Sequence, residues 1–161
     1  MSGAIAIGPE SPLKDDIREL VRQLNAHLHA LTPPEFCFHM TVEQMADAAT
    51  TLFVARDESG RAVGMGALRR DADMVAEVKR MYTLPDFRGR HVGSGILDRI
   101  VALAEAEGFA RLVLETGDRH PEAWRLYESR GFARCGPILD YRDSRYSVFY
   151  EKALGSGRVA A

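Results

Sequence analysis

A short segment rich in arginine and glycine carries the clearest chemical signal in this sequence. It reads Arg88-Gly89-Arg90-His91-Val92-Gly93-Ser94-Gly95 and runs directly into apolar residues with helical spacing. The first amides of a helix have no partner within the helix, and the helix dipole adds about half a positive charge, so phosphate oxygens bind well there. Glycine within a helix costs roughly 1 kcal/mol relative to alanine, and close approach of a phosphate would explain Gly93 and Gly95. The alternative is a flexible, solvated entry to the helix.

Composition restricts where such an anion site could lie. The chain has 161 residues, of which 46% are hydrophobic and 27% charged, as is usual for one globular domain. We expect this domain to span residues 1–154 and residues 155–161 to form a disordered tail. With 21 basic and 23 acidic residues, the chain has no general attraction for nucleic acid or an anionic membrane. An anion site must therefore be local.

Cysteine usage and hydropathy favour a cytoplasmic protein. The cysteines are Cys37 and Cys135, and they show no paired spacing of metal ligands, so we expect no metal. The first residues lack the long apolar run of a signal peptide, and no stretch has the length and hydropathy of a membrane span. The reducing cytoplasm is therefore the expected location.

Hydrophobic periodicity predicts the elements that must position the segment. Helical spacing predicts helices over residues 13–31, 41–48, 92–107 and 121–130. Thr41 with Gln44 is suited to a capping box at the second helix. Alternation and turn signals predict strands over residues 5–7, 52–56, 62–69, 74–83, 111–115, 132–135 and 147–152. This order predicts a mixed sheet with helices on both faces, in which ligands bind where the strand topology changes.

The predicted strand over residues 74–83 is irregular at its centre. Strict alternation would place Met81 on the same face as the charged side chains of Glu77 and Lys79. A β-bulge near Arg80 or Met81 would remove this mismatch, and bulges occur often beside active sites.

The common nucleotide-binding motifs are absent from the segment. A Walker phosphate loop requires Gly-Lys-Ser/Thr after a glycine and four residues, and no such run occurs. A dinucleotide fingerprint requires a third glycine three positions after Gly95, where Asp98 stands. With both motifs excluded, the segment still offers successive backbone amides together with Arg88 and Arg90. Such a site suits a pyrophosphate that is bound without an obligatory metal.

Four blocks of this sequence resemble the Gcn5-related N-acetyltransferase family. They cover residues 77–85, 88–95, 114–117 and 123–132, and the likeness extends from Leu52 to Leu154. The pyrophosphate motif of the family maps onto Arg88, His91 and Gly93, with His91 in place of the usual first glycine. The resemblance implies an α+β fold of three layers, α/β/α, around a central mixed and mostly antiparallel sheet. The first fifty residues match only in general pattern, and in this family they shape the acceptor site.

The resemblance also implies acetyl-coenzyme A as the co-substrate, without a metal. It would lie between the bulged strand and the strand over residues 111–115, with the pantetheine arm along the backbone of the bulged strand. The expected cofactor-binding residues are Met81, Tyr82, Thr83, Arg88, Gly89, Arg90, His91, Val92, Gly93, Ser94 and His120. His120 stands where many relatives have an asparagine that contacts the cofactor, and its alternative role is that of a helix cap.

The same resemblance assigns catalytic roles to a carboxylate and a phenol. Glu77 would take the proton of the attacking amine, directly or through water, unless it only pairs with Lys79 or Arg80. Tyr127 would protonate the departing thiolate, unless it only packs on the sheet. The expected acceptor-binding residues are Phe36, Phe38, His39 and Tyr141, with core packing as their alternative role.

The sequence thus predicts an N-acetyltransferase that acts on a primary amine of a small molecule or on a free amino terminus. Direct attack within a ternary complex requires no covalent enzyme intermediate. One alternative is a non-catalytic sensor of acyl-coenzyme A with the same fold. Another is an acyltransferase with a different acyl donor or a hydroxyl acceptor. Homodimers are common among similar proteins, so a homodimer is one expected assembly.

Overall fold

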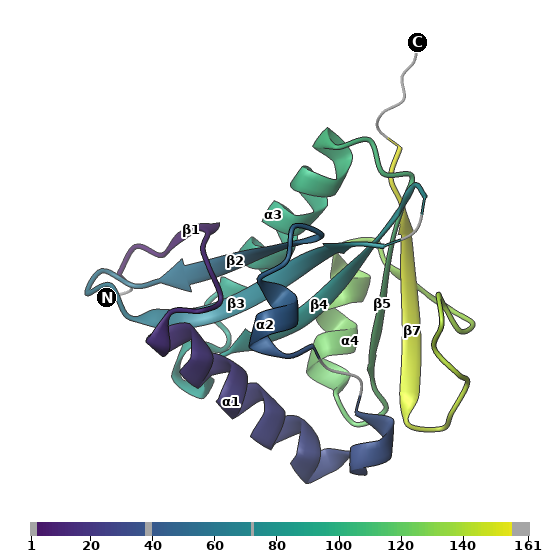
Figure 1. The fold of residues 1–161 in the computed structure, drawn as a ribbon, viewed down its shortest axis with the longest axis horizontal. Helices are drawn as coiled ribbons and strands as arrows, with labels where there is room; N and C mark the ends of the chain where they lie inside the picture. Colours follow the sequence, from purple (N-terminus) through teal and green to yellow (C-terminus); the bar gives the residue numbers. More distant parts are fainter. Residues whose placement is uncertain (1–2, 38–39, 72, 156–161) are drawn as a thin grey trace.

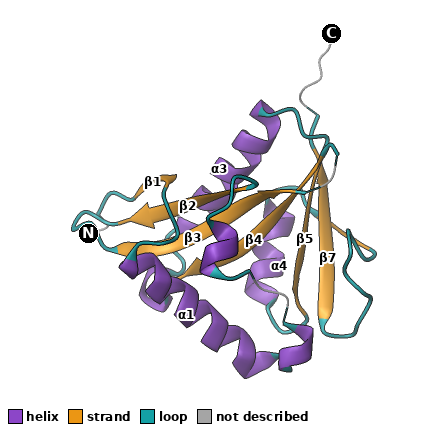
Figure 2. Ribbon diagram, viewed as in Figure 1, coloured by secondary structure: helices purple, strands orange, loops and turns teal. Residues whose placement is uncertain are grey.

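The computed structural model describes residues 3–37, 40–71 and 73–155 and contains a seven-stranded mixed sheet (Figures 1 and 2). The strands are β1 (Ala6–Pro9), β2 (Thr50–Arg56), β3 (Ala62–Arg70), β4 (Val75–Thr83), β5 (Arg111–Gly117), β6 (Ala133–Cys135) and β7 (Ser147–Ala153). Their spatial order is β1-β2-β3-β4-β5-β7-β6, and every pairing is antiparallel except that of β4 with β5. The predicted α+β fold with a mostly antiparallel sheet is confirmed.

Helices cover both faces of the sheet. Helix α1 (Asp15–Leu31) and the short α2 (Val42–Met45) lie on one face, and α3 (Val92–Ala106) and α4 (Pro121–Ser129) lie on the other (Figure 1). The periodic apolar residues of α1 are its buried stripe: Ile17, Leu20, Val21 and Leu24. In α3, Ile96, Leu97 and Ile100 are fully buried against the sheet. The core therefore lies in two layers, one on each side of the strands.

Two helices differ from the predicted bounds by more than one residue at an end, each for a local reason. Helix α1 begins at Asp15 rather than residue 13, because the backbone N–H of Leu13 is bonded to Ser11 Oγ in a preceding turn. The predicted capping box of α2 is present, with Gln44 N donating to Thr41 Oγ1 at 3.1 Å. This helix ends at Met45 rather than residue 48, and Asp47 Oδ1 accepts from the N–H of Ala49 in the turn that follows.

The predicted bulge is present in β4. Met65 of β3 pairs with Tyr82 and Ala67 pairs with Lys79, so Gly66 faces two residues of β4, Arg80 and Met81. Arg80 has a φ of 59°, in the left-handed region. A Cβ on Gly66 would lie 2.4 Å from Met81 Sδ, so the bulge and the glycine require each other.

The single parallel pairing determines where a cavity can open. Strands β4 and β5 pair only through Val75–Arg111, Ala76–Leu112 and Glu77–Val113. Beyond Glu77, β4 continues to Thr83 against β3 alone, whereas β5 continues to Gly117 against β7. The two strands therefore diverge toward their carboxyl ends (Figure 1). This is also the point where the direction of pairing changes.

No helix within the described ranges is long and apolar enough to cross a membrane. Among the same residues, no group of three or more His, Cys, Asp or Glu side chains could hold a metal ion. Most of the tail that the sequence predicts to be disordered, residues 156–161, lies outside the described part.

Candidate active site

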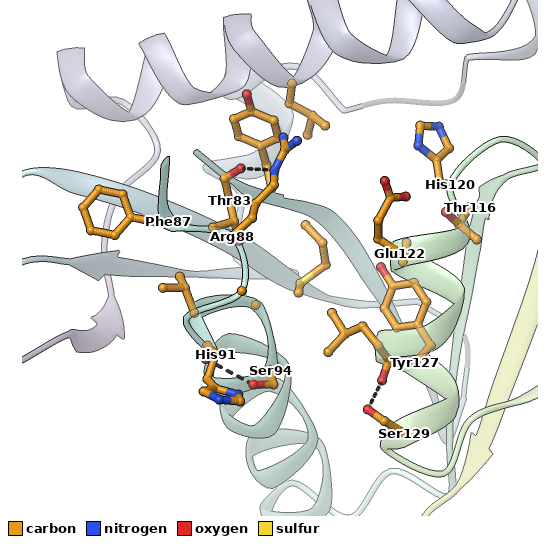
Figure 3. A pocket seen from close by; sticks show the side chains of 18 of the residues that line it. Thr83, Phe87, Arg88, His91, Ser94, Thr116, His120, Glu122, Tyr127 and Ser129 are labelled. Carbon is orange, nitrogen blue, oxygen red and sulfur yellow. Dashed lines mark hydrogen bonds between the residues drawn. The ribbon is translucent and has the colours of Figure 1, made fainter. Parts of the chain in front are cut away.

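A cavity of about 610 Å³ opens between the diverging strands, bounded by α1, α3 and α4 (Figure 3). All of the expected cofactor-binding residues line it except Arg90, whose guanidinium lies 4.9 Å from the centre of the Phe87 ring. Residues of α1 and α4 that sequence analysis did not assign also line it: Leu24, His27, Leu28, Glu122, Ala123, Leu126 and Ser129. Leu24, His27 and Leu28 lie in α1, and for this region sequence analysis identified only the helical spacing of the apolar residues.

The amino-terminal end of α3 forms one wall of this cavity. His91 is the N-cap residue with a φ of 63°, and its side chain caps no backbone amide. Ser94 Oγ donates to the carbonyl oxygen of His91 at 3.1 Å (Figure 3). Glycine adopts the left-handed conformation at no steric cost, whereas His91 adopts it with a side chain. The uncapped first-turn amides and the helix dipole suit an anion.

Arg88 is held at the edge of the same anion-binding wall. Its Nε donates to the carbonyl oxygen of Thr83 at 3.0 Å, and its guanidinium lies 5.6 Å from the centre of the Tyr82 ring (Figure 3). Both contacts hold the guanidinium at the cavity beside Thr83 and the Tyr82 ring.

The two glycines in the first turn of α3 have different explanations. A Cβ on Gly95 would lie 2.9 Å from Ile7 Cδ1, so packing against β1 explains this glycine without a ligand. A Cβ on Gly93 would meet Leu126 and Thr83 at ordinary contact distances of 3.5 and 3.6 Å. Gly93 lines the cavity. Ligand contact therefore remains an explanation for Gly93 alone.

Two histidines face each other on the opposite side of the cavity. The rings of His27 and His120 lie 5.4 Å apart, and His120 is 9% exposed. Burial lowers the pKa of both side chains. Repulsion from His27 lowers the pKa of His120 further, and repulsion from Arg88 does the same to His27. His120 is at the N-cap position of α4 but makes no side-chain cap, and its Nε2 has no partner among the described residues. The side chain of His120 therefore does not cap α4 by a hydrogen bond, although the residue stands at the N-cap position.

Tyr127 lies where the large cavity meets a smaller one. It is 5% exposed, and its ring packs against Phe132 and Tyr150 at centroid distances of 5.8 and 5.9 Å. It lines both cavities, as do Met81 and Thr116. Burial, reinforced by the charge of Glu115, raises the pKa of the Tyr127 phenol. The hydroxyl therefore keeps its proton at neutral pH and can donate it only to a stronger base.

The smaller cavity, of about 110 Å³, has a hydrogen-bonded cluster at its wall. Tyr141 Oη donates to Glu77 Oε2 at 2.5 Å, and Lys79 Nζ donates to Tyr141 Oη at 2.8 Å. Lys79 Nζ also lies 3.4 Å from Glu77 Oε2. Tyr141 and Lys79 line the cavity, but Glu77, 3% exposed, lies behind them. Burial raises the pKa of Glu77, against the opposing effect of Lys79.

A second acidic residue, Glu115 near the end of β5, does line the smaller cavity. Ser147 Oγ on β7 donates to Glu115 Oε2 at 2.8 Å. Burial raises the pKa of Glu115 from 4.5 to about 7, with the Glu77 charge adding to the effect and Ser147 and Lys79 opposing it. In the sequence, Glu115 could be only the end of a strand, because its burial depends on distant elements.

The expected acceptor-binding residues are only partly described. Tyr141 lines the smaller cavity. Phe36 is described through its backbone, as the last residue of the 3-10 helix η1 (Pro34–Phe36), and Phe38 and His39 lie outside the described residues.

The arrangement suits an extended anionic ligand with its reactive end between two strands. The anion-binding helix end is at one side, and Tyr127 with ionisable groups is at the other. Comparison with known proteins agrees, since residues 17–132 match the Acetyltransferase (GNAT) family. The chain belongs to this family and is an acyltransferase.

Individual relatives support the same assignment. IAA acetyltransferase of Azospirillum brasilense is 37% identical over 93% of this chain and 98% of its own length. A Klebsiella pneumoniae structure assigned as an acyl-CoA N-acyltransferase has a TM-score of 0.79 and 27% identity, covering 93% of this chain and 97% of its own. The PaiA N-acetyltransferase of Thermoplasma acidophilum, solved with coenzyme A, shares the fold, with a TM-score of 0.71 and 15% identity over 94% of this chain and 99% of its own.

Proposed function

We propose that the protein transfers the acetyl group of acetyl-coenzyme A to a primary amine of a small molecule or to a free amino terminus. The observation that carries this proposal is the meeting of two cavities at Met81 and Tyr127. One cavity has an anion-binding end, and the other has ionisable groups. A donor and an acceptor could therefore approach each other there from opposite sides, in one ternary complex.

The larger cavity suits the donor. The first amides of α3 and the guanidinium of Arg88 would bind the diphosphate. Along β4, residues 81–83 have no strand partner on the side of β5, which leaves backbone groups for the amides of a pantetheine arm. A bound thioester would then reach the bulge, where an amide near Met81 could stabilise the developing oxyanion.

The smaller cavity suits the amine and its proton. As the C–N bond forms and the C–S bond breaks, the nitrogen loses one proton and the sulfur gains one. Tyr127 would supply the proton to sulfur. Glu115 would accept the proton from nitrogen, because its carboxyl group lines the cavity. Glu77, the base expected from the sequence, would act only through Tyr141 or a water. Return of the proton from carboxyl to phenol would complete the cycle.

The test is release of coenzyme A thiol from acetyl-coenzyme A over a broad panel of amines. IAA is assayed as a separate acceptor because the Azospirillum relative is named for it. We expect turnover with at least one amine and formation of its N-acetyl product. Tight binding of coenzyme A with no thiol release from any acceptor would favour the sensor. Faster turnover with other acyl groups or with hydroxyl acceptors would favour an acyltransferase with a different acyl donor or a hydroxyl acceptor.

Replacement of Tyr127 by phenylalanine tests the acid in the same assay. We expect a fall in kcat of about 100-fold or more, a range usual for loss of a positioned proton donor, with the Kd for acetyl-coenzyme A changed less than threefold. Tyr150→Phe is the matched control, because Tyr150 is a buried neighbour whose hydroxyl donates to Glu128 and which lines neither cavity. Full turnover by Tyr127→Phe from pH 6 to 9 would reject the role.

A further inference from the structure

Arg80 places a buried positive charge beside the smaller cavity without an acidic partner in the described structure. Its side chain is 7% exposed, and its Nε has no hydrogen-bond partner among the described residues. One Nη donates to Asn25 Oδ1 of α1. Burial lowers the pKa of Arg80 to about 10, and no nearby carboxylate raises it again, so the group stays charged at neutral pH. A buried charge without a counterion is costly, and a ligand can supply the missing partner.

The bulge directs Arg80 toward the cavity. The residue has a φ of 59°, which L residues rarely adopt, and such strain is concentrated at functional sites. From β4 the side chain crosses to Asn25, whose neighbours on α1, Leu24 and Leu28, line the smaller cavity together with Arg80. The guanidinium therefore lies on the α1 side of this cavity.

The lysine and the glutamate that line the same cavity already have protein partners. Lys79 contacts Glu77 and the Tyr141 hydroxyl, and Glu115 on the β5 side accepts from Ser147. Arg80 is thus a cation that lines the smaller cavity and has no carboxylate partner among the described residues. A carboxylate is the anion that matches a guanidinium, through paired N–H···O bonds.

We propose that the acceptor amine also bears a carboxylate, as in an amino acid, and that Arg80 binds this carboxylate on the α1 side while the amine faces Glu115. This assignment rests on the proposed acetyl transfer and names its substrate class. Arg80 would act in specificity, since a carboxylate held at one wall presents the amine to the gap between Met81 and Tyr127. The volume of about 110 Å³, several times what one water requires, is sufficient for a small carboxylate-bearing group.

The experiment compares matched acceptors in the thiol-release assay. Each free amino acid is assayed beside its α-amide and its decarboxylated amine, which keep the amine and side chain but lack the carboxylate. For the best acceptor we expect kcat/KM at least 30-fold higher for the carboxylate form. Equal turnover of all three forms would overturn the assignment and leave acetyl transfer intact. Coenzyme A binding with no turnover of any acceptor would instead overturn the proposed function.

Substitutions at Arg80 test whether this residue produces the preference for the carboxylate form. Arg80→Gln should reduce the preference for the carboxylate form to less than threefold, with the Kd for coenzyme A unchanged. Arg22→Gln is the control, because Arg22 lies exposed on α1 and pairs with Glu19. An undiminished preference in Arg80→Gln, or weakened coenzyme A binding alone, would contradict the role of Arg80. If Arg80→Gln does not fold, Arg80→Lys provides the same comparison, because it retains a charge but loses the paired donors and should lower the preference partially.

Discussion

At the scale of single residues, the chemistry depends on ionisable groups whose neighbours come from elsewhere in the chain. Glu115 lies near the end of β5, and Ser147 and the charges of Glu77 and Lys79 all affect its pKa. Tyr127 was recognised in the sequence from its surrounding block, but its place between two cavities is a property of the fold. A residue type and a motif could thus be predicted, whereas a pKa near neutrality could not.

The raised pKa of Glu115 predicts a pH dependence of catalysis. Because this pKa is about 7, the carboxylate that accepts a proton disappears below neutrality, and kcat at saturating substrates should fall about tenfold per pH unit there. Glu115→Gln should lower kcat about 100-fold or more and abolish this acid limb. A steady-state pH profile of both proteins from pH 5 to 9 measures the effect. An unchanged limb in Glu115→Gln, lost instead in Glu77→Gln, would assign the base to Glu77.

The same substitution also affects stability in a direction that can be calculated from the pKa. Folding raises the pKa of Glu115 from 4.5 to about 7, so the folded state disfavours the ionised form. The cost is absent below pH 4.5, grows as the pH rises, and is complete above about 7. The free energy of unfolding of Glu115→Gln relative to wild type should therefore increase over this interval in urea titrations. A relative decrease would contradict the buried position of the carboxyl group.

At the scale of elements, the bulge in β4 is the feature that the sequence indicated most directly. Strict alternation would have placed Met81 with charged residues, and the structure places Met81 against the core while Arg80 takes the left-handed conformation. Element ends were less predictable, because they depend on local turns such as those at Ser11 and Asp47. The resemblance implied that the first fifty residues shape the acceptor site, but it did not identify Leu24 and Leu28 of α1, which line the smaller cavity. Helical spacing shows which face of a helix is apolar but not which cavity it faces.

Gly66 offers a test of how the bulge supports the site. In Gly66→Ala the added Cβ would lie 2.4 Å from Met81 Sδ and 2.7 Å from Ile96 Cγ2, so Met81 and α3 must move. We expect a loss of about 1–3 kcal/mol in the free energy of unfolding and weaker coenzyme A binding. Gly8→Ala in β1 is the control, because its Cβ would meet nothing within 4 Å. Denaturant titration of both variants measures the free energy of unfolding, and calorimetry measures coenzyme A binding. Equal stability of the two variants would contradict this account of the bulge.

At the scale of the whole molecule, one parallel pairing creates the site. Because β4 and β5 separate after Glu77, the carboxyl end of β4 is open on one side and α3 begins beside it. Most of the proposed donor half could be predicted, since its expected residues other than His120 are close together in the sequence, from 81 to 94. The proposed acceptor half combines α1, β4, β5 and the segment that holds Tyr141, and no local pattern brings these elements together.

The central claim is that the amino-terminal end of α3 and Arg88 bind the diphosphate of coenzyme A. Titration calorimetry of the folded protein with coenzyme A and with pantetheine, which lacks the diphosphate, tests it most directly. We predict saturable heat with coenzyme A and at least 100-fold weaker binding of pantetheine, because the amides and the guanidinium lose their anion. Equal affinity for the two, or no heat from coenzyme A at millimolar concentration, would contradict the account.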